Sequence, residues 1–169
     1  MPERNARYFL KDKEAKALLD EASRRLKANL TEILAGGPSI EVVWTELGRI
    51  FLSSGRPLLA EAKGSLYPTL IFNELFAVMP KVVVDMGAIP YICKGADVMA
   101  PGIRHFEGDF GKEDLVVIVD EKYGKAVAIG EVQYSFEEAS KVRRGVVVKT
   151  IHFVSDKTWN WIKELETKV

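Results

Sequence analysis

Apolar residues recur at spacings of three and four along the first part of the chain, which predicts an amphipathic helix over residues 12–35. The apolar positions are Ala15, Leu18, Leu19, Ala22, Leu26, Leu30 and Ile33. Asp12 is the expected N-cap, and Gly36-Gly37-Pro38 is a strong stop signal. We interpret the polar side as a solvated face, with a surface for a partner or RNA as the alternative. Its cations are Lys13, Lys16, Arg24, Arg25 and Lys27.

The pattern then changes to short runs with the composition of β-strands. Between residues 40 and 62 these runs are IEVVWTE, RIFLS and PLLAEA, separated by turn-like segments at 47–49 and 53–56. Such an alternation of strands and turns predicts an antiparallel meander. A further turn is expected at Tyr67-Pro68, followed by a short apolar helix that starts near Thr69 and ends before Pro80.

The second half of the chain is rich in β-branched residues. Strands are predicted at 82–85, 115–120, 126–133 and 145–153. Between the last two, Ser135 and Glu138 form a capping-box pattern that predicts a short helix over 136–142. A final helix is expected to start at Ser155 or Asp156 and to place on one face Trp159, Ile162 and Leu165.

These elements predict an α+β protein with two domains. Residues 1–79 would form an N-terminal α/β domain, a long helix plus an antiparallel meander, and residues 80–169 a β-barrel with short helices. No Ser- or Gly-rich linker lies near the boundary at Met79-Pro80, so we expect the halves to pack together. Near-alternating strand positions predict the barrel core: Val82, Val84, Val116, Ile118, Val127, Ile129, Val146 and Val148.

Charge and cysteine content narrow the classes of function. The 169 residues include 24 basic and 24 acidic side chains, so a nucleic-acid site would have to be a local patch. The single cysteine, Cys93, excludes an internal disulfide and suits a reducing cytoplasm; in the run IPYIC we expect it to be buried. No apolar run approaches the roughly 20 residues of a membrane span, and the polar N-terminus does not resemble a secretory signal. A cytoplasmic protein without a membrane partner is therefore expected.

The sequence carries no recognisable catalytic or metal-binding pattern. Two distant histidines, His105 and His152, and one cysteine do not match a zinc site, and nothing local supports a Cys–His nucleophile. The glycines near residues 102–111 lack phosphate-loop and dinucleotide spacing. Asp85 follows an apolar strand, where we expect it to cap the turn into Gly87-Ala88. No catalytic residue, metal or cofactor is therefore predicted.

The segment 81–105, KVVVDMGAIPYICKGADVMAPGIRH, is the most informative part of the chain. It predicts a strand, a helical turn and a second extended piece, with cations beside them. Gly95-Ala96 leave the backbone nearly bare, so another backbone or a ligand can approach closely. Glycine at 95 has two possible causes: a positive φ required by the fold, or space for bound RNA. We favour the second, because Lys94 and Arg104 flank the segment.

This run resembles the signature of PUA domains, named after pseudouridine synthases and archaeosine transglycosylases. The downstream pieces AVAIGEVQYSFEEASKVRRG and VVVKTIHFVSDKTWNW continue in the order expected of that family. The whole arrangement, including SLYPTL before the boundary, resembles the malignant-T-cell-amplified-sequence family of translation factors and its archaeal relatives. The resemblance is most specific over about residues 80–162. It implies an N-terminal α/β domain followed by a PUA-type β-barrel.

The resemblance also implies binding of structured RNA, either rRNA or tRNA. Carried over to this sequence, the implied surface consists of Lys94, Gly95, Ala96, Asp97, Val98 and Arg104. Val98 could contact RNA or fill the core. From charge and position alone we add four cations, some of which could instead favour the end of the predicted helix. They are Lys141, Arg143, Arg144 and Lys149.

Partners are implied in the same way. Eukaryotic relatives act at the small ribosomal subunit with a second protein that carries an initiation-factor-like domain, and the N-terminal domain would be its docking surface. Two other functions stay open at this point. One is a non-catalytic accessory module for RNA modification; the other is a protein-interaction module without RNA binding, which the zero net charge allows.

Overall fold

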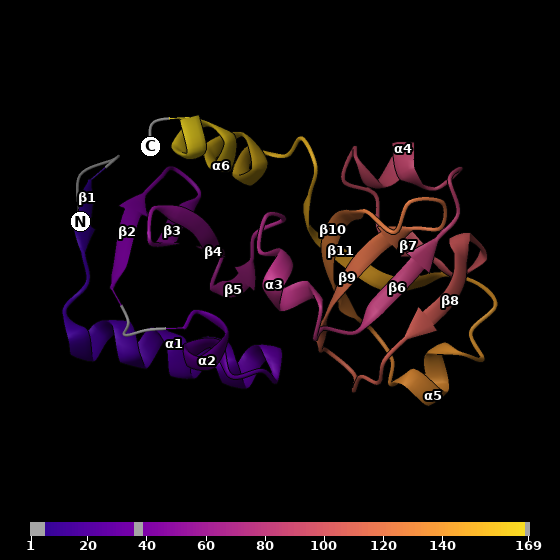
Figure 1. The fold of residues 1–169 in the computed structure, drawn as a ribbon. Coiled ribbons are helices and arrows are strands. Elements are labelled where there is room, and N and C mark those ends of the chain that lie inside the picture. Colours follow the sequence, from indigo (N-terminus) through magenta and orange to yellow (C-terminus); the bar gives the residue numbers. More distant parts are fainter. Residues whose placement is uncertain (1–5, 36–38, 168–169) are drawn as a thin grey trace.

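The computed structural model describes residues 6–35 and 39–167, which form two β-sheets with helices around them (Figure 1). The first sheet is antiparallel, and its strands follow one another in sequence order. They are β1 (Arg7–Phe9), β2 (Ile40–Trp44), β3 (Gly48–Ser53), β4 (Arg56–Ala62) and β5 (Ser65–Pro68). The predicted meander is thus present, extended by one strand on each side.

There are physical reasons why the sequence did not predict β1 and β5. β1 is three residues long and fully exposed, so it has no apolar alternation that would mark it as a strand. β5 includes Tyr67-Pro68, where a turn was expected. That prediction is wrong, because Pro68 pairs with Leu59 at the last position of an edge strand, where proline's missing N–H is tolerated. The short helix that follows, α3, spans Asn73–Phe76.

The predicted helix over 12–35 is two helices. α1 (Asp12–Leu26) begins after Lys11 rather than at a capping Asp12, and it ends where Lys27 adopts a left-handed φ of 53°. Asn29 then caps α2 (Leu30–Ile33), accepting the Glu32 N–H at 3.1 Å. The apolar period continues across the break because Leu26 and Leu30 are buried in the same core. The expected stop at 36–38 lies outside the described residues.

The second sheet curls into a barrel. Its strand order is β7-β11-β10-β9-β6-β8, and β6 and β9 are the parallel pair. The outermost strands, β7 and β8, are joined by one short turn at Ala100–Gly102, so the two ends of the sheet lie close together. The strands are β6 (Lys81–Val84), β7 (Val98–Met99), β8 (Ile103–Glu107), β9 (Leu115–Asp120), β10 (Ala126–Val132) and β11 (Val146–Phe153). The short helices are α4 (Ile89–Ile92) and α5 (Phe136–Ala139), the latter shorter than predicted.

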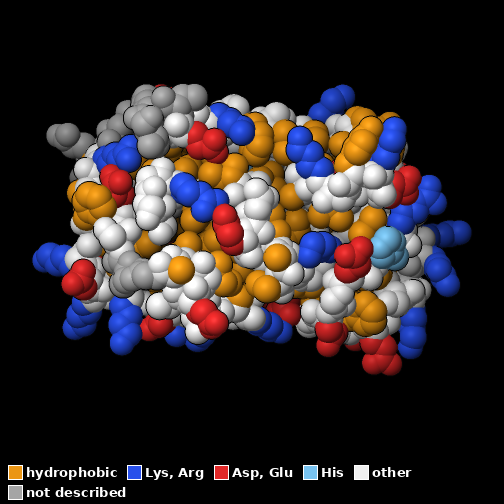
Figure 2. Space-filling model, in the orientation of Figure 1, with side chains coloured by type: hydrophobic (Ala, Val, Ile, Leu, Met, Phe, Trp, Pro, Cys, Tyr) orange, Lys and Arg blue, Asp and Glu red, His pale blue; other side chains and the backbone are white. Residues whose placement is uncertain are grey.

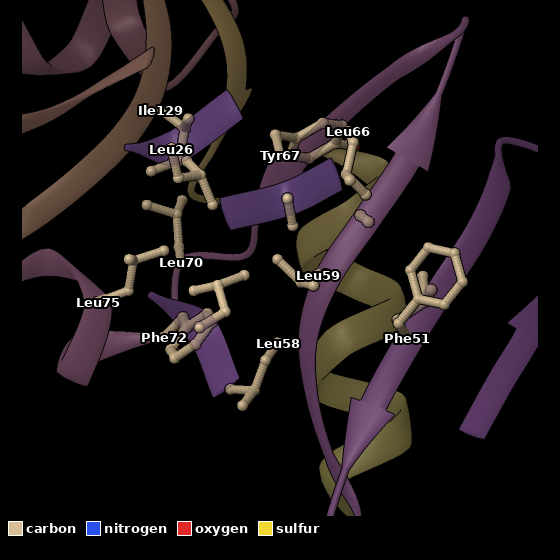
Figure 3. Close-up of a cluster of buried hydrophobic side chains, with 14 of the residues drawn as sticks. Leu26, Phe51, Leu58, Leu59, Leu66, Tyr67, Leu70, Phe72, Leu75 and Ile129 are labelled. Carbon is tan, nitrogen blue, oxygen red and sulfur yellow. The ribbon is translucent and has the colours of Figure 1, made fainter. Parts of the chain in front are cut away.

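The predicted barrel core is confirmed with two corrections. Seven of the eight positions are buried, but Val146 is only partly so and Val147 is buried instead. The pairing of β11 with β7 shifts register between Val146 and Val148, which breaks the strict alternation. Ile129 packs with the N-terminal half rather than inside the barrel, and lies beside Leu26 in Figure 3.

The two halves share one hydrophobic core. All six residues of β9 are buried, since one face lines the barrel and the other faces the N-terminal half. Polar contacts also join α1 to the barrel. Arg25 donates a hydrogen bond to the Glu113 carbonyl at 2.6 Å and forms an ion pair with Glu131 at 3.1 Å. Lys27 forms an ion pair with Asp114. The polar face of α1 is therefore solvated at Lys13, Lys16 and Arg24, but its C-terminal end contacts the barrel.

The last helix returns to the first sheet. α6 (Lys157–Thr167, yellow in Figure 1) packs on β4, and Thr158 shares a hydrogen bond of 2.9 Å with the hydroxyl of Tyr67. Ile162 and Leu165 are buried as predicted, whereas Trp159 is only partly covered. The C-terminal segment thus holds the N-terminal sheet against the barrel.

The fully buried side chain of His152 forms hydrogen bonds between the two halves of the chain and with the residue before α6. The Nε2 atom of His152 accepts the Leu70 N–H at 3.2 Å, which leaves the proton on Nδ1 to donate to Asp156 at 2.9 Å. Asp156 also accepts the N–H groups of Phe153 and Trp159 and so caps α6. Burial alone would raise the pKa of Asp156, but the hydrogen bonds from His152, Trp159 and Phe153 outweigh it and lower the pKa below its ordinary value.

An acid-sensitive contribution to stability follows from Asp156. A pKa lowered in the folded state means that the ionised carboxylate stabilises the fold at neutral pH, and that this contribution is lost as the pH falls through the lowered value. We expect Asp156→Asn to cost about 1–3 kcal/mol at neutral pH and progressively less below the ordinary carboxyl range. Thermal melts of both proteins between neutral and acidic pH test this. A gap that stays constant on acidification would contradict it.

Candidate nucleic-acid interface

A cavity of about 330 Å³ lies at the seam where the barrel closes. Its walls come from β8, from α5 and from the segment before β11. Among the described residues β8 pairs only with β6, so its other edge is unpaired at this seam. The lining residues are Ala100, Ile103, Arg104, His105, Phe106, Phe136, Ala139, Ser140, Val142, Arg143 and Val147.

Two predicted cations meet at this cavity from segments almost forty residues apart in sequence. Arg104 is exposed and pairs through Nε with Glu121 at 2.6 Å. Arg143 is exposed, and within the described part of the chain it makes no ion pair or hydrogen bond. His105 lies beside them and contacts Glu107 at 3.0 Å. Arg143 can therefore bind an anion directly, whereas Arg104 would exchange Glu121 for it.

Aromatic rings form the other wall, a feature that the sequence did not reveal. Phe136 packs edge to face on Phe106 and Phe110, and those two rings are tilted toward each other, with ring centroids 5.5–6.1 Å apart. Phe110 is buried, but Phe136 stays 37% exposed at the cavity. Phe106 and Phe110 are four residues apart, whereas Phe136 comes from α5 and is brought to them by the fold. A partly exposed ring beside cations can stack on a base.

The glycine-bearing segment is held against β11 by a backbone carbonyl and a side-chain carboxylate, both of which accept hydrogen bonds from Thr150. The Ala96 carbonyl accepts the Thr150 hydroxyl at 2.9 Å, and the Asp97 carboxylate accepts the Thr150 N–H at 3.0 Å. Val98 is buried in the barrel core, so it fills the core rather than a binding surface. Lys94 is exposed, and no ion pair forms with it among the residues that the structure describes. Within the segment 94–98 that the resemblance implies for RNA binding, Lys94 is therefore the residue whose positive charge is available to bind an anion.

Gly95 has a positive φ of 96°. A positive φ required by the fold was one of the two causes that the sequence left open for a glycine at this position. A Cβ atom there would also lie 3.3 Å from the ring of Phe153. Substitution of Gly95 therefore changes stability as well as any contact with a ligand. The fold requirement is therefore met, and the expected space for bound RNA at Gly95 stays a prediction.

We expect Gly95→Ala to lower the free energy of unfolding by about 1–2 kcal/mol, since the backbone conformation is unfavourable for a residue with a Cβ. Chemical denaturation measures this loss. Gly111→Ala is the matched control, because Gly111 has no positive φ and a Cβ there would meet its nearest neighbours at 3.6 Å or more. Equal stability of the two variants would show that the conformation at residue 95 is not restrictive.

The remaining predicted cations do not form one patch. Lys141 makes only a long contact of 3.9 Å with Glu137, and Arg144 is exposed next to Arg143. Lys149 lies in a different cavity, between the two halves of the chain. Figure 2 shows basic side chains distributed around the visible face among acidic ones, with apolar side chains toward its centre. This distribution agrees with a net charge of zero and with a small, local site.

Other candidate groups have structural explanations. Asp85 accepts the Ala88 N–H at 2.8 Å, which confirms its predicted capping role. Cys93 is partly exposed rather than buried, and burial of its thiol still raises its pKa, which disfavours a reactive thiolate. Within residues 6–35 and 39–167, no three His, Cys, Asp or Glu side chains are placed to hold a metal ion. No helix in these ranges is long and apolar enough to cross a membrane.

Comparison with known families matches two parts of the chain to two family descriptions. Residues 80–154 match the PUA domain family, and residues 6–73 match a family described as a domain of unknown function (DUF1947). A PUA-domain protein of Aeropyrum pernix K1, solved as a tartrate complex, has a similar structure with a TM-score of 0.83 and 27% identity. The similarity covers 96% of this chain and 93% of that one.

Relatives from several organisms match in sequence, among them the following three. An uncharacterized protein of Methanocaldococcus jannaschii is 34% identical over 158 residues, which cover 92% of this chain and 96% of the relative. Translation machinery-associated protein 20 of Saccharomyces cerevisiae is 29% identical over 157 residues, covering 88% and 87% of the two chains. Malignant T-cell-amplified sequence 1-B of Xenopus laevis is 30% identical over 104 residues, or 59% of this chain and 58% of that one.

Proposed function

This chain contains a PUA domain and belongs to the same family as its Methanocaldococcus jannaschii relative, and we propose that it binds structured RNA, either rRNA or tRNA, through its barrel. The observation that carries the proposal is the meeting of Arg104 and Arg143 at one cavity beside the exposed ring of Phe136. Arginine binds phosphate through a planar pair of donors, and an aromatic ring can stack on an unpaired base. The cavity offers both contacts within one small area.

Recognition by this surface would depend on RNA shape more than on sequence. Its cations are few and separate, so they suit phosphates at defined positions on a folded RNA better than a long single strand. Arg144 is exposed next to Arg143 in the chain and could contact a neighbouring phosphate. Neutral overall charge keeps nonspecific binding weak, which leaves specificity to the local geometry.

The cellular role that we propose is in translation, in the cytoplasm. This proposal is supported by the sequence similarity to a yeast protein whose name places it with the translation machinery. The similarity covers 88% of this chain and 87% of the yeast protein. The small ribosomal subunit is the proposed site of action, and the N-terminal sheet is the proposed docking surface for a second protein with an initiation-factor-like domain. The chain would act by binding, without catalysis of its own.

Crosslinking in cells, followed by sequencing of the bound RNA and by sedimentation of ribosomal subunits, tests this proposal. We expect rRNA or tRNA to be enriched and the protein to sediment with the small subunit. The matched control is the double variant Arg104→Glu/Arg143→Glu, which should recover far less RNA. If the wild-type protein recovers no more RNA than this variant, the barrel is not an RNA-binding surface.

A further inference from the structure

A larger cavity, of about 710 Å³, lies between the two halves of the chain. One wall comes from the first sheet, at the end of β2 and the hairpin of β4 and β5; the other comes from β10, β11 and the start of α6. The hydrogen bond between Tyr67 and Thr158 closes its floor. None of its lining residues belongs to the cavity at the barrel seam. We call it the interdomain cleft.

Three lysines from three separate elements line the interdomain cleft. Lys63 comes from the hairpin between β4 and β5, Lys149 from β11, and Lys157 from the first position of α6. All three are exposed, and in the described ranges none of them makes an ion pair or a hydrogen bond. Unpaired ammonium groups gathered around one concave surface repel each other and attract anions.

The acidic residues of the interdomain cleft are already engaged by other groups. Glu131 pairs with Arg25 at 3.1 Å, which offsets the negative charge of this carboxylate. Asp156 accepts hydrogen bonds from His152 and from two backbone N–H groups. Glu46 accepts the indole N–H of Trp161 at 3.2 Å. The carboxylates therefore have donors of their own, while the lysines are left for a ligand.

We propose that the interdomain cleft is a second binding site, specific for phosphate groups. The ammonium group of lysine is a compact point charge that binds phosphate from many directions, as three lysines on different elements require. The phosphates could belong to an RNA backbone or to a small phosphate ester. A ligand that spans Lys63 and Lys149 would bridge the two halves. The site is separate from the proposed RNA surface at the barrel seam, and either could exist without the other.

The conformation of Lys63 provides a clean way to remove one charge. Lys63 and Gly64 form a two-residue hairpin turn between the paired residues Ala62 and Ser65, with φ values of 53° and 76°. Asn-Gly is the preferred sequence for such a turn, because asparagine tolerates the left-handed conformation better than lysine does. Lys63→Asn should therefore remove the ammonium group without weakening the hairpin.

The test compares two triple variants of the full chain by amide chemical-shift mapping. The cleft variant is Lys63→Asn/Lys149→Gln/Lys157→Gln, and the control, Lys13→Gln/Lys16→Gln/Lys112→Gln, makes the same change of charge on exposed surface elsewhere. The probes are inorganic phosphate and a single-stranded oligouridylate. With wild-type protein we expect saturable shifts at 63–65, 149–151 and 157–158, retained in the control and weakened about tenfold or more in the cleft variant.

The two probes separate the sources of phosphate. Shifts with inorganic phosphate identify a site open to small phosphate esters, and shifts with oligouridylate alone identify an RNA backbone; either result supports the proposal. The absence of saturable shifts at the interdomain cleft with both probes would overturn it, as would equal weakening in both triple variants. Arg104→Glu/Arg143→Glu protein should still bind at the cleft, so failure of the barrel surface is distinguished from failure of this site.

Discussion

Replacement of His152 by alanine is expected to lower the free energy of unfolding by about 3–5 kcal/mol. The side chain is fully buried, so its removal leaves a cavity at the junction of the two halves. It also leaves the Leu70 N–H without its acceptor and Asp156 without its ring donor. The loss should therefore exceed that of an ordinary core truncation of similar size, and both halves should be affected together because they share one core.

Urea denaturation followed by circular dichroism measures this loss. The chain offers a matched control in His105→Ala, because His105 is exposed on β8 and its ring pairs with the exposed Glu107. We expect the control to change stability by less than about 0.5 kcal/mol. A His152→Ala protein as stable as the control would show that the junction does not depend on this histidine.

The double variant Arg104→Glu/Arg143→Glu is expected to weaken binding of structured RNA about 100-fold. Each reversal removes a phosphate contact and adds repulsion, at a cost of about one order of magnitude in affinity. The slope of log affinity against log salt should fall by about two, since two fewer phosphates are neutralised. Folding should be preserved, because both side chains are exposed.

Electrophoretic mobility shifts at several salt concentrations measure both quantities. Lys13→Glu/Lys16→Glu is the matched control, because these lysines lie on the solvated side of α1. We expect this control to bind nearly as well as wild type at every salt concentration. Equal losses in the two double variants would indicate a larger RNA surface spanning both halves.

The sequence predicted those elements whose apolar pattern is continuous. β9 and β10 were recognisable because runs of Val and Ile mark a buried strand whatever its partners are. The break at Lys27 was hidden, since Leu26 and Leu30 keep the helical spacing on both sides of it. β1 was missed because its residues are exposed and gain order from pairing with β2, which no local pattern reveals.

The candidate site was predictable only in part, for a similar reason. The motif around Lys94 and Gly95 could be recognised from local sequence, and so could the cation run that contains Arg143. Their relative positions depend on barrel closure, which brings Arg143 to Arg104 and sends Lys149 to the interdomain cleft. The ion pair of Arg104 with Glu121 and the exposed ring of Phe136 likewise arise from contacts between segments distant in sequence.

The central claim is that structured RNA binds at the barrel seam, and mass spectrometry of ultraviolet-crosslinked peptides tests it most directly. Purified full-length protein would be crosslinked to tRNA and to small-subunit rRNA, and the RNA-bearing peptides identified. The account predicts crosslinks in peptides that contain β8 and the segment from α5 to the start of β11, with Phe136 or its neighbours among the attachment points. Crosslinks confined to α1 and the first sheet, or none with either RNA, would contradict it.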